Sequence, residues 1–424
     1  MESSCELQES KRFPKEQTGL LEAVVPRSRD NIEVGLLTGC RDKPYVYGLV
    51  MALISKEVYL DLIGSDEVDS HEFHGTPKLN FLNLGGKKQQ TDGLTRKLFR
   101  LISYYTRLIR YTTAAKPRIF HVLWNYKLEY FDRTLLMLYY KLLGKKIALT
   151  AHNVNAGKRD SNDSLLNRLT LRIQYRLVDH IFVHTEQMKG ELLQDFGVRE
   201  GAITVIPFGI NNAVPCTDLT TTEAKRRLGI KDGERTILFF GHIGPYKGLE
   251  YLIDAFHRII ARNGDYRLII AGNPRRGSVK YVNEMREATS GYVDRGRIIQ
   301  RIEHIPDQEI ELYFKAADVL VLPYSFIFQS GVLFLGYSFG LPVVATDVGS
   351  LREDIVEGET GFLCRPCDPV GLARTVERYF ESDLFKSLSS RRGKIRDYAS
   401  KRHSWDAVAE MSRRVYAELG SDLL

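Results

Sequence analysis

The chain has few cysteines and no long apolar run. Its 424 residues include five cysteines, too few for a disulfide framework. Only Cys364 and Cys367 are spaced as a pair, and a zinc site would need a second pair or a nearby histidine as well. No stretch reaches the roughly 18 uninterrupted apolar residues of a membrane-spanning helix. These absences exclude disulfide-rich and membrane-spanning classes of protein and favour a reducing cytoplasm.

A strong excess of charge is lacking too. The net charge is only +7, and the hydrophobic (43%) and charged (27%) fractions are ordinary for a globular protein. This balance permits an anionic substrate or membrane surface but does not indicate a nucleic-acid partner. The first 29 residues are polar and charged without an apolar segment, which predicts a disordered lead-in and not a signal peptide.

The glycine motif of dinucleotide-binding enzymes is missing from the end of the first apolar segment. The sequence there is GCRDKPYVYG at 39–48, where a dinucleotide oxidoreductase would carry GxGxxG. We therefore do not expect oxidoreductase chemistry.

Short apolar segments of strand length alternate with helical segments along the chain. In the first half they lie at 32–39, 58–64, 118–124, 146–154, 180–185 and 203–210. In the second half they lie at 236–242, 266–273, 297–302, 319–325, 342–348 and 361–364. This alternation predicts an α/β protein with two doubly wound, Rossmann-like parallel-sheet domains facing across a cleft.

The domain boundaries follow from a polar, turn-rich segment at 211–224, which we interpret as a linker. We predict a lead-in at 1–29, a first domain at 30–212, a second domain at 213–395 and a C-terminal helix at 396–424. The amphipathic pattern of SWDAVAEMSRRVYAELG predicts a helix that either crosses back to the first domain or packs on its own domain.

Two glycine-rich turns in the second half are typical of phosphate binding. One runs from Gly241 to Lys247 and Gly248 between a strand and a helix, and the other is QSGVL at 329–333. Glycines let the backbone approach an anion, a lysine supplies a point charge, and a helix start presents N–H groups. Two such turns on one domain predict a diphosphate held between them.

Several residues end the predicted parallel strands, where ligands bind in open α/β sheets. In the second half these are Gly241, Gly272, Tyr324 and Thr346, and in the first half they are Gly39, Trp124, His152 and His184. Two such rims facing each other would form a site between the domains.

In the motifs of both halves, the chain resembles the family 4 glycosyltransferases of the GT-B fold. The matching motifs are TAHNV (150–154), VIPFGI (205–210), GHIGPYKGLEYLIDAF (241–256), IPDQEIELYFKAADVLVLPYS (305–325) and SGVLFLGYSFGLPVVATDVGSLREDIVEGETGFL (330–363). The resemblance implies a retaining enzyme that moves a sugar from a nucleoside-diphosphate sugar to a glycan, lipid-linked or small-molecule hydroxyl in glycoconjugate or polysaccharide biosynthesis. It also implies no cofactor and no metal.

The resemblance and the chemistry of a diphosphate leaving group together assign the site. We expect His152 and Lys247 to be catalytic, although His152 could instead cap a helix. Diphosphate binding is assigned to Gly241, His242, Lys247, Gln329, Ser330, Gly331 and Val332. Further donor or nucleotide contacts are assigned to Gly272, Asn273, Arg301, Tyr324 and Glu353, of which Glu353 could equally cap a helix. The acceptor side is assigned to Gly39, Lys43, Tyr45, Trp124 and His184.

Two departures from the family's pattern bear on donor recognition. The two glutamates that the family places eight positions apart are replaced by Ile327 and Leu335. This feature resembles a sub-branch with QSGVL at that place, in which Gln329 could supply a neutral amide. The family's usual arginine near the first turn is His242 here, so we expect Lys247 to carry more of the diphosphate's charge. Arg275, Arg276 and Arg301 are the candidate helpers.

The segment 94–113 interleaves five basic residues with Leu, Ile, Phe and Tyr. At helical spacing this predicts either a helix on an anionic membrane, peripheral to its inner face, or an ordinary helix covering the sheet.

Two other functions stay open for this architecture. One is a nucleotide-sugar epimerase that acts without an acceptor. The other is a non-catalytic nucleotide-sugar-binding subunit, which the two missing glutamates would suit.

Overall fold

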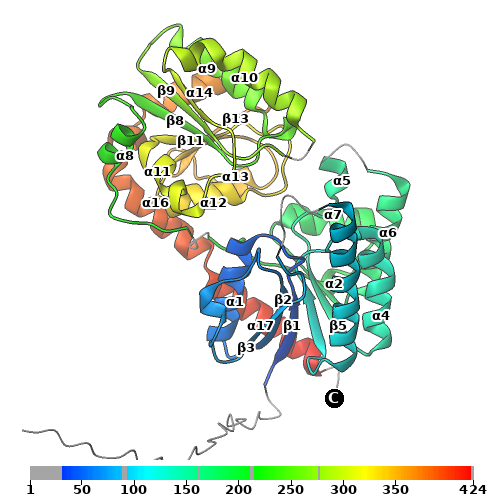
Figure 1. The fold of residues 1–424 in the computed structure, drawn as a ribbon. Helices are drawn as coiled ribbons and strands as arrows, with labels where there is room; N and C mark the ends of the chain where they lie inside the picture. The colour runs from blue at the N-terminus through cyan, green and yellow to red at the C-terminus, as the bar shows by residue number, and fades with distance from the viewer. Residues whose placement is uncertain (1–30, 88–92, 160–162, 211–213, 276, 422–424) are drawn as a thin grey trace, which may run out of the picture. The chain divides into compact units, whose positions relative to one another are not determined.

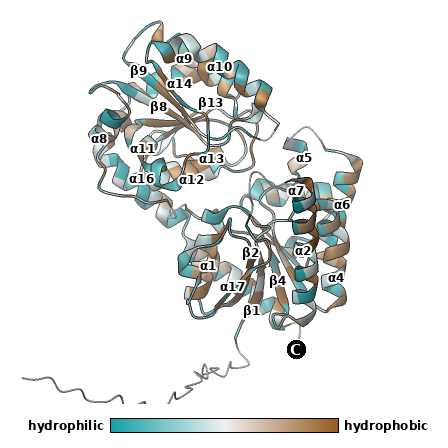
Figure 2. Ribbon diagram, viewed as in Figure 1, coloured by the Kyte–Doolittle hydropathy of each residue, from teal (hydrophilic) through white to brown (hydrophobic). Residues whose placement is uncertain are grey.

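The computed structural model describes residues 31–87, 93–159, 163–210, 214–275 and 277–421 (Figure 1). Residues 32–424 form one compact unit, and the predicted lead-in lies outside the described residues. Within the described part, the strands form two separate parallel sheets, as predicted from the alternation of strands and helices. Figure 2 shows the strands of both sheets as largely hydrophobic, as expected for parallel strands covered by helices on both faces.

The first sheet has seven parallel strands in the order β3-β2-β1-β4-β5-β6-β7. Its strands are β1 (Glu33–Leu37), β2 (Tyr59–Gly64), β3 (Leu79–Asn83), β4 (Ile119–Val122), β5 (Lys146–Thr150), β6 (His180–Val183) and β7 (Ile203–Val205). The six segments predicted as strands in this half are confirmed. The edge strand β3 was not predicted, because its sequence LNFLN is half polar and is only partly buried.

The second sheet has six parallel strands in the order β10-β9-β8-β11-β12-β13. They are β8 (Arg235–Phe240), β9 (Tyr266–Ala271), β10 (Ile298–Arg301), β11 (Val319–Leu322), β12 (Val343–Thr346) and β13 (Gly361–Cys364). All six segments predicted as strands in this half are confirmed. The order reverses between β8 and β11, as it does between β1 and β4 in the first sheet. Such reversals are where crevices open at the carboxyl ends of the strands.

Some helices of the first domain begin and end at residues with recognisable signals. Thr185, for example, caps α7 by accepting a hydrogen bond from the amide of Met188, and Gly197 ends the helix with φ 65°. The first-domain helices are α1 (Lys43–Ser55), the 3₁₀ turn η1 (His71–Phe73), α2 (Leu94–Ala114), α3 (Glu129–Phe131), the π-helical η2 (Asp132–Leu136), α4 (Met137–Leu142), α5 (Ala156–Arg159), α6 (Leu165–Leu177), α7 (Glu186–Phe196) and the 3₁₀ turn η3 (Glu200–Ala202).

Helices of the second domain cover its sheet in the same way. They are α8 (Thr221–Arg227), the 3₁₀ turn η4 (Pro245–Lys247), α9 (Leu249–Ile260), α10 (Val279–Asp294), α11 (Asp307–Ala316), α12 (Gly331–Ser338), α13 (Leu351–Asp354), α14 (Pro369–Glu381), α15 (Asp383–Lys386) and α16 (Leu388–Arg402). A further helix, α17 (Trp405–Ser421), follows them along the chain. α9 has buried residues on one side, from Leu249 to Ile259, and acidic Glu250 in its first turn, which suits the helix dipole.

The last helix, α17, packs on the first sheet and not on the second. Its Trp405 lies so close to α1 that a Cβ on Gly48 would come within 2.2 Å of the indole. The indole N–H also donates to the carbonyl of Ile210. Further along, the hydroxyl of Tyr416 lies 2.6 Å from Nδ1 of the buried His121 in β4. The chain therefore returns to its first domain after completing the second.

None of the helices that the structure describes is long and apolar enough to cross a membrane.

Candidate functional site

Two glycines at the carboxyl ends of β8 and β9 allow an unusually close approach of backbone. Gly241 has φ 111° and Gly272 has φ 142°, values that side-chain-bearing residues rarely adopt. A Cβ on Gly272 would lie 1.9 Å from the carbonyl oxygen of Gly241. Only glycine fits at this contact, so both strand ends leave a bare backbone surface beside the point where the strand order reverses.

Lys247 lies in the loop that follows Gly241, at the end of the 3₁₀ turn Pro245–Lys247. Its side chain is largely buried. Its Nζ lies 3.8 Å from the centroid of the Tyr324 ring and 5.3 Å from that of Tyr246, distances at which an ammonium is attracted by the ring face. Gly248, with φ 63°, then turns the chain into α9. The ammonium is thus held by packing at one place.

The start of α12 lies against this loop. The hydroxyl of Tyr324 is 3.2 Å from Oγ of Ser330, and a Cβ on Gly241 would meet Cγ2 of Val332 at 3.0 Å. The structure therefore brings the two glycine-rich turns together. Ser330 makes no side-chain capping hydrogen bond, and the first N–H groups of any helix lack acceptors within the helix. The amides of Gly331 and Val332 consequently form an electropositive end beside Lys247.

The structure shows where the residues that replace the two usual glutamates lie. Ile327 and Leu335 are both buried in the core of the second domain, so no carboxylate can point from either position. Gln329 lies between them, just before α12. Its Oε1 is buried without a hydrogen-bond partner among the described residues, a costly state that a ligand hydroxyl would relieve.

His242 follows Gly241 directly, and its pKa is lowered first by partial burial and then by the positive charges of Lys247 and Arg275. A neutral imidazole is favoured there, which differs from the arginine that the family usually carries. Arg275 lies on the other side of Tyr246, with its guanidinium 5.2 Å from the ring centroid. The other candidate helper, Arg276, lies outside the described residues.

The remaining donor candidates occupy less central positions. Asn273 follows Gly272, and its carbonyl accepts from the amide of Ile243. Arg301 is paired with the carboxylates of Glu303 and Glu309. Glu353 lies exposed in the short helix α13, and its carbonyl accepts from Arg402. The roles assigned to these residues stay predictions.

In the first domain, His152 and His184 follow β5 and β6 and form a hydrogen-bonded pair. Nε2 of His184 lies 3.1 Å from Nδ1 of His152, and Nδ1 of His184 lies 3.3 Å from the carbonyl oxygen of Ile206. Burial lowers the pKa of His184 to about 4 and that of His152 well below its usual value. Both imidazoles are therefore neutral near pH 7.

The protons of this pair can be assigned from its partners. A carbonyl oxygen only accepts, so Nδ1 of His184 carries the proton and its Nε2 accepts. Nδ1 of His152 must then donate to His184, which leaves the lone pair of His152 on Nε2. That nitrogen is buried without a protein partner among the described residues. The pair thus presents one hydrogen-bond acceptor to any ligand at the end of β5.

An aromatic cluster fixes the orientation of His152. The ring of Trp124 stacks on it with centroids 4.1 Å apart and planes 3° apart. Tyr45 meets His152 edge to face, with ring centroids 4.6 Å apart and planes 84° apart, and also contacts Trp124. The residue is only 2% exposed. Tyr45 therefore supports the rim from the core. Gly39, with φ 58°, lets the loop pass Trp124, and Lys43 begins α1.

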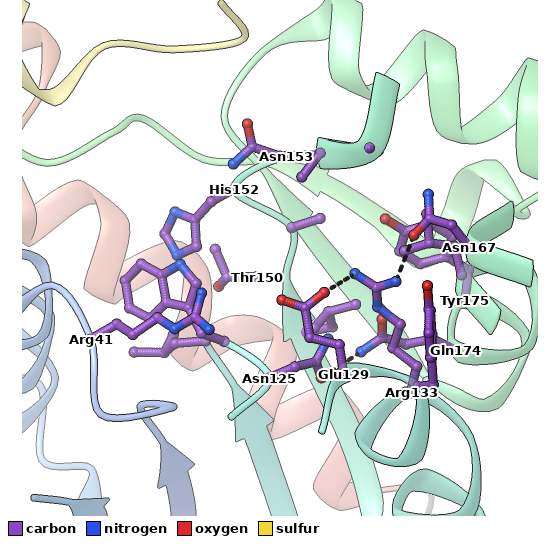
Figure 3. Close-up of a pocket in the computed structure, with 18 of the residues that line it drawn as sticks. Arg41, Asn125, Glu129, Arg133, Thr150, His152, Asn153, Asn167, Gln174 and Tyr175 are labelled. Atoms are coloured by element: carbon purple, nitrogen blue, oxygen red, sulfur yellow. Dashed lines mark hydrogen bonds and ion pairs between the residues drawn. The ribbon is translucent and has the colours of Figure 1, made fainter. Parts of the chain in front are cut away.

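A cavity of 540 Å³ opens beside His152 at the carboxyl ends of β4 and β5 (Figure 3). Its lining is Arg41, Leu123, Trp124, Asn125, Glu129, Tyr130, Arg133, Leu149, Thr150, Ala151, His152, Asn153, Ala156, Gly157, Asn167, Leu171, Gln174, Tyr175 and Arg275. Arginine, glutamate and amide side chains dominate this wall. Polar side chains of these kinds suit a ligand with hydroxyl or anionic groups.

Most of the polar wall was not predicted from the sequence. Arg133 donates to Glu129 at 2.9 Å and to Asn167 at 2.8 Å, and its Nε is buried without a partner among the described residues. Gln174 likewise donates to Asn125 at 3.1 Å. The sequence offered only a weak signal for this wall. Glu129 and Arg133 are spaced i, i+4, and Asn167 and Gln174 are spaced i, i+7, so each pair shares a helix face. Nothing in the sequence indicates that these two faces meet.

No group of three or more His, Cys, Asp or Glu side chains that could hold a metal ion occurs within the described ranges. The expectation that no metal takes part stays a prediction.

Comparison with known proteins assigns both domains. Residues 44–214 match the family described as Glycosyltransferase Family 4, and residues 234–382 match the family described as Glycosyl transferases group 1. Each domain is thus similar to a glycosyltransferase family, and the two parallel sheets have the GT-B architecture. The expected family 4 relationship is confirmed at this level, whereas the narrower sub-branch with QSGVL stays a prediction.

Relatives and solved structures agree with this assignment. The chain is 27% identical over 280 residues to D-inositol 3-phosphate glycosyltransferase of Corynebacterium efficiens; the match covers 63% of this chain and 65% of that relative's length. It is 28% identical over 239 residues to an uncharacterised glycosyltransferase of Methanocaldococcus jannaschii, covering 55% of this chain and 58% of that one.

Two solved structures show the same fold at low sequence identity. Sucrose-phosphate synthase from Thermosynechococcus elongatus superposes with a TM-score of 0.72 at 17% identity, covering 92% of this chain and 99% of that one. HepE of Anabaena, solved in complex with UDP and glucose, superposes with a TM-score of 0.70 at 16% identity, covering 91% and 99%.

Proposed function

We propose that this protein is a glycosyltransferase that moves a sugar from a nucleoside-diphosphate sugar to an acceptor hydroxyl and retains the configuration of the anomeric carbon. One observation carries the proposal: the Lys247 ammonium and the amino end of α12 converge beside the bare backbone of Gly241. A cation and a helix start at one point are what a diphosphate requires. A nucleotide-containing structural neighbour, HepE with UDP and glucose, motivates the same choice of donor.

The proposed reaction depends on the leaving group. As the bond from the anomeric carbon to the phosphate oxygen breaks, negative charge grows on the diphosphate. Lys247 and the amides of Gly331 and Val332 stabilise that charge, and their fixed positions require little reorganisation. The acceptor oxygen then bonds to the anomeric carbon on the face that the phosphate leaves. The departing phosphate oxygen takes the acceptor's proton, so no protein nucleophile is needed.

His152 and Gln329 are proposed to hold the donor sugar. Nε2 of His152 and Oε1 of Gln329 are both buried acceptors without a partner among the described residues, and each can accept a hydrogen bond from a sugar hydroxyl. In this scheme His152 positions the sugar as a neutral acceptor and does not act as a cation.

The cavity beside His152 is proposed to bind the acceptor. Its polar wall suits a polyhydroxylated molecule, and Arg41 and Arg275 add positive charge to its lining. The relatives named D-inositol 3-phosphate glycosyltransferases make D-inositol 3-phosphate the first acceptor to try.

The experiment has two steps. A panel of nucleotide sugars is first screened by thermal shift, because a ligand that binds the folded state raises the melting temperature. The stabilising donor is then mixed with candidate acceptors, and the anomeric proton of the product is followed by NMR. We expect transfer only when an acceptor is present, with the donor's anomeric configuration retained. An inverted product, or a donor sugar isomerised without an acceptor, would refute the proposal.

A non-catalytic nucleotide-sugar-binding subunit is the second candidate. It is favoured by the apolar, buried residues at the positions of both usual glutamates, Ile327 and Leu335. Strong donor stabilisation without transfer or hydrolysis across a broad acceptor screen would support this alternative.

A further inference from the structure

Three helices that cover one face of the first sheet carry an unusual amount of exposed apolar surface. They are α2, the continuous helical segment 129–142 (α3, η2 and α4) and α6, which Figures 1 and 2 show side by side. Of the fifteen large hydrophobic side chains that are exposed in the described residues, thirteen lie on these helices or next to them. The other two, Val279 and Val370, lie in the second domain.

Hydrogen bonds between the three helices show that they form one layer. The hydroxyl of Tyr105 in α2 donates to Asp132 at 2.8 Å, and Thr113 of α2 lies 2.7 Å from the hydroxyl of Tyr139. Arg133 of the middle segment in turn donates to Asn167 of α6 at 2.8 Å. Because the inner sides of all three helices are occupied in this way, their exposed apolar side chains share the outer side.

We call this outer side the three-helix face. It comprises Leu94, Leu98, Phe99, Ile102 and Ile109 of α2, Leu135, Leu138 and Leu142 of the middle segment, and Leu165, Leu166 and Leu169 of α6. Phe99, Leu142 and Leu165 are 75%, 77% and 86% exposed. Packing on the sheet does not explain them, since α2 packs there through a different set that includes Tyr104, Tyr105 and Leu108.

The two outer helices of this surface, α2 and α6, both carry positive charge. α2 contains Arg96, Lys97, Arg100, Arg107 and Arg110, and α6 contains Arg168, Arg172 and Arg176. Neither helix contains an aspartate or a glutamate, although Arg168 pairs with the neighbouring Asp163. Apolar side chains flanked by arginine and lysine are the pattern of helices that lie in the interface of an anionic bilayer.

We propose that the three-helix face docks on an anionic lipid bilayer. Charge complementarity favours a bilayer as the partner. The basic residues of α2 and α6 attract phosphate headgroups, while the leucines and Phe99 enter the boundary with the acyl chains. A second copy of the chain would bring like charges together across the same face, which opposes self-association. The cavity beside His152 is lined by the inner sides of the middle segment and α6, so docking would hold that cavity close to the headgroups.

The test uses the full chain and vesicles of phosphatidylcholine with or without phosphatidylglycerol. We expect sedimentation with the anionic vesicles at low salt, little with the neutral ones, and weaker binding as salt rises. The triple variant Leu98→Gln, Phe99→Gln, Ile102→Gln and the triple variant Leu165→Gln, Leu166→Gln, Leu169→Gln should each bind about tenfold more weakly or worse. Replacing Arg107 and Arg110 by glutamine should cost about fivefold for each residue.

A matched control lies in the second domain. The double variant Val279→Gln, Lys280→Gln removes an exposed apolar side chain and an exposed cation from α10 and should bind as the unchanged protein does. Hydrogen exchange of the unchanged protein supplies a readout that needs no variant. Anionic vesicles should slow exchange within 94–114 and 165–177 relative to α10.

Three results would overturn the proposal. The first is no binding to anionic vesicles at low salt. The second is an equal loss in the α10 control. The third is a dimer in sedimentation velocity that the α2 variant dissociates, which would make the face an interface between copies of the chain.

Discussion

A single ammonium, that of Lys247, stands where the two glycine-rich turns of the second domain meet. Its distance of 3.8 Å from the Tyr324 ring and its burial hold it in place before any ligand arrives. Such preorganisation matters because a side chain that is already positioned loses little freedom in the transition state. With His242 kept neutral by partial burial and neighbouring cations, Lys247 is the principal cation of the proposed diphosphate site.

Replacing Lys247 should lower the rate of turnover without unfolding the protein. We expect Lys247→Ala to lower kcat by roughly 100-fold to 1000-fold, as loss of a transition-state charge donor does, while the far-UV spectrum and cooperative melting persist. Steady-state kinetics with the stabilising donor measures the effect, and Lys280→Ala on the exposed surface of α10 is the control. A loss smaller than about threefold, which is about 0.65 kcal/mol, would reject the assignment.

The tautomer of His152 can be read directly. We expect nitrogen-15 NMR to show the proton of His152 on Nδ1 and the lone pair on Nε2. In His184→Phe, which removes the hydrogen-bond acceptor, the proton should move to Nε2 and activity should fall by about tenfold, the cost of one lost hydrogen bond. His180→Asn, in the strand β6 that precedes His184 but bonded to Thr204, should change neither the tautomer nor the activity. A proton on Nε2 in the unchanged protein would contradict the proposed sugar contact.

At the scale of elements, the carboxyl ends of the strands and the starts of the helices position the site. Strands buried on both faces appear in the sequence as uninterrupted apolar runs, so every strand except the half-exposed β3 could be predicted. The segment 131–144 could be predicted as helical, but its π-helical part from Asp132 to Leu136 could not. Its i, i+5 hydrogen bonds depend on packing, and no local pattern in the sequence specifies them.

Buried histidines should make the first domain sensitive to acid. Burial lowers the pKa of His121 to about 3 and those of His180 and His184 to about 4. The unfolded chain therefore takes up protons below its histidine pKa of about 6.5 while the folded chain does not, so the stabilisation is complete above that pH and is lost on acidification towards pH 4.

The expected loss can be measured by urea unfolding. At pH 5 each such histidine should lower the free energy of unfolding by about 2 kcal/mol relative to pH 7.5. The variant His121→Asn should be less stable at pH 7.5 but should show a smaller drop between the two pH values. An unfolding free energy that is constant over this range would show that the histidines are protonated in the folded state.

The contact between α1 and α17 gives a second test at this scale. We expect Gly48→Ala to lower the free energy of unfolding by about 1–3 kcal/mol through overpacking, because the new methyl group would lie 2.2 Å from Trp405. In α7, a Cβ on Gly190 would meet no described atom within 4 Å, so Gly190→Ala should instead be neutral or stabilising by up to about 1 kcal/mol. Equal effects of the two substitutions in chemical denaturation would mean that α17 does not pack there.

At the scale of the whole molecule, the sequence predicted two parallel-sheet domains but not how distant segments meet. The amphipathic stripe of α17 shows that one side of the helix is buried, but it does not show which domain covers that side. Only the structure shows that α17 packs on the first sheet. The polar cavity is a similar case, since Arg133 and Asn167 approach only when two helices pack together. The glycine-rich turns could be recognised from the sequence, because only glycine fits where the backbone must approach a ligand or another strand closely.

The central claim is that a diphosphate binds between Lys247 and the start of α12. The most direct measurement is a crystal structure of the protein with the nucleoside diphosphate of its preferred donor. We predict phosphate oxygens within hydrogen-bond distance of Nζ of Lys247 and of the amides of Gly331 and Val332. A nucleotide bound elsewhere, or those amides already occupied by protein carbonyls, would contradict it.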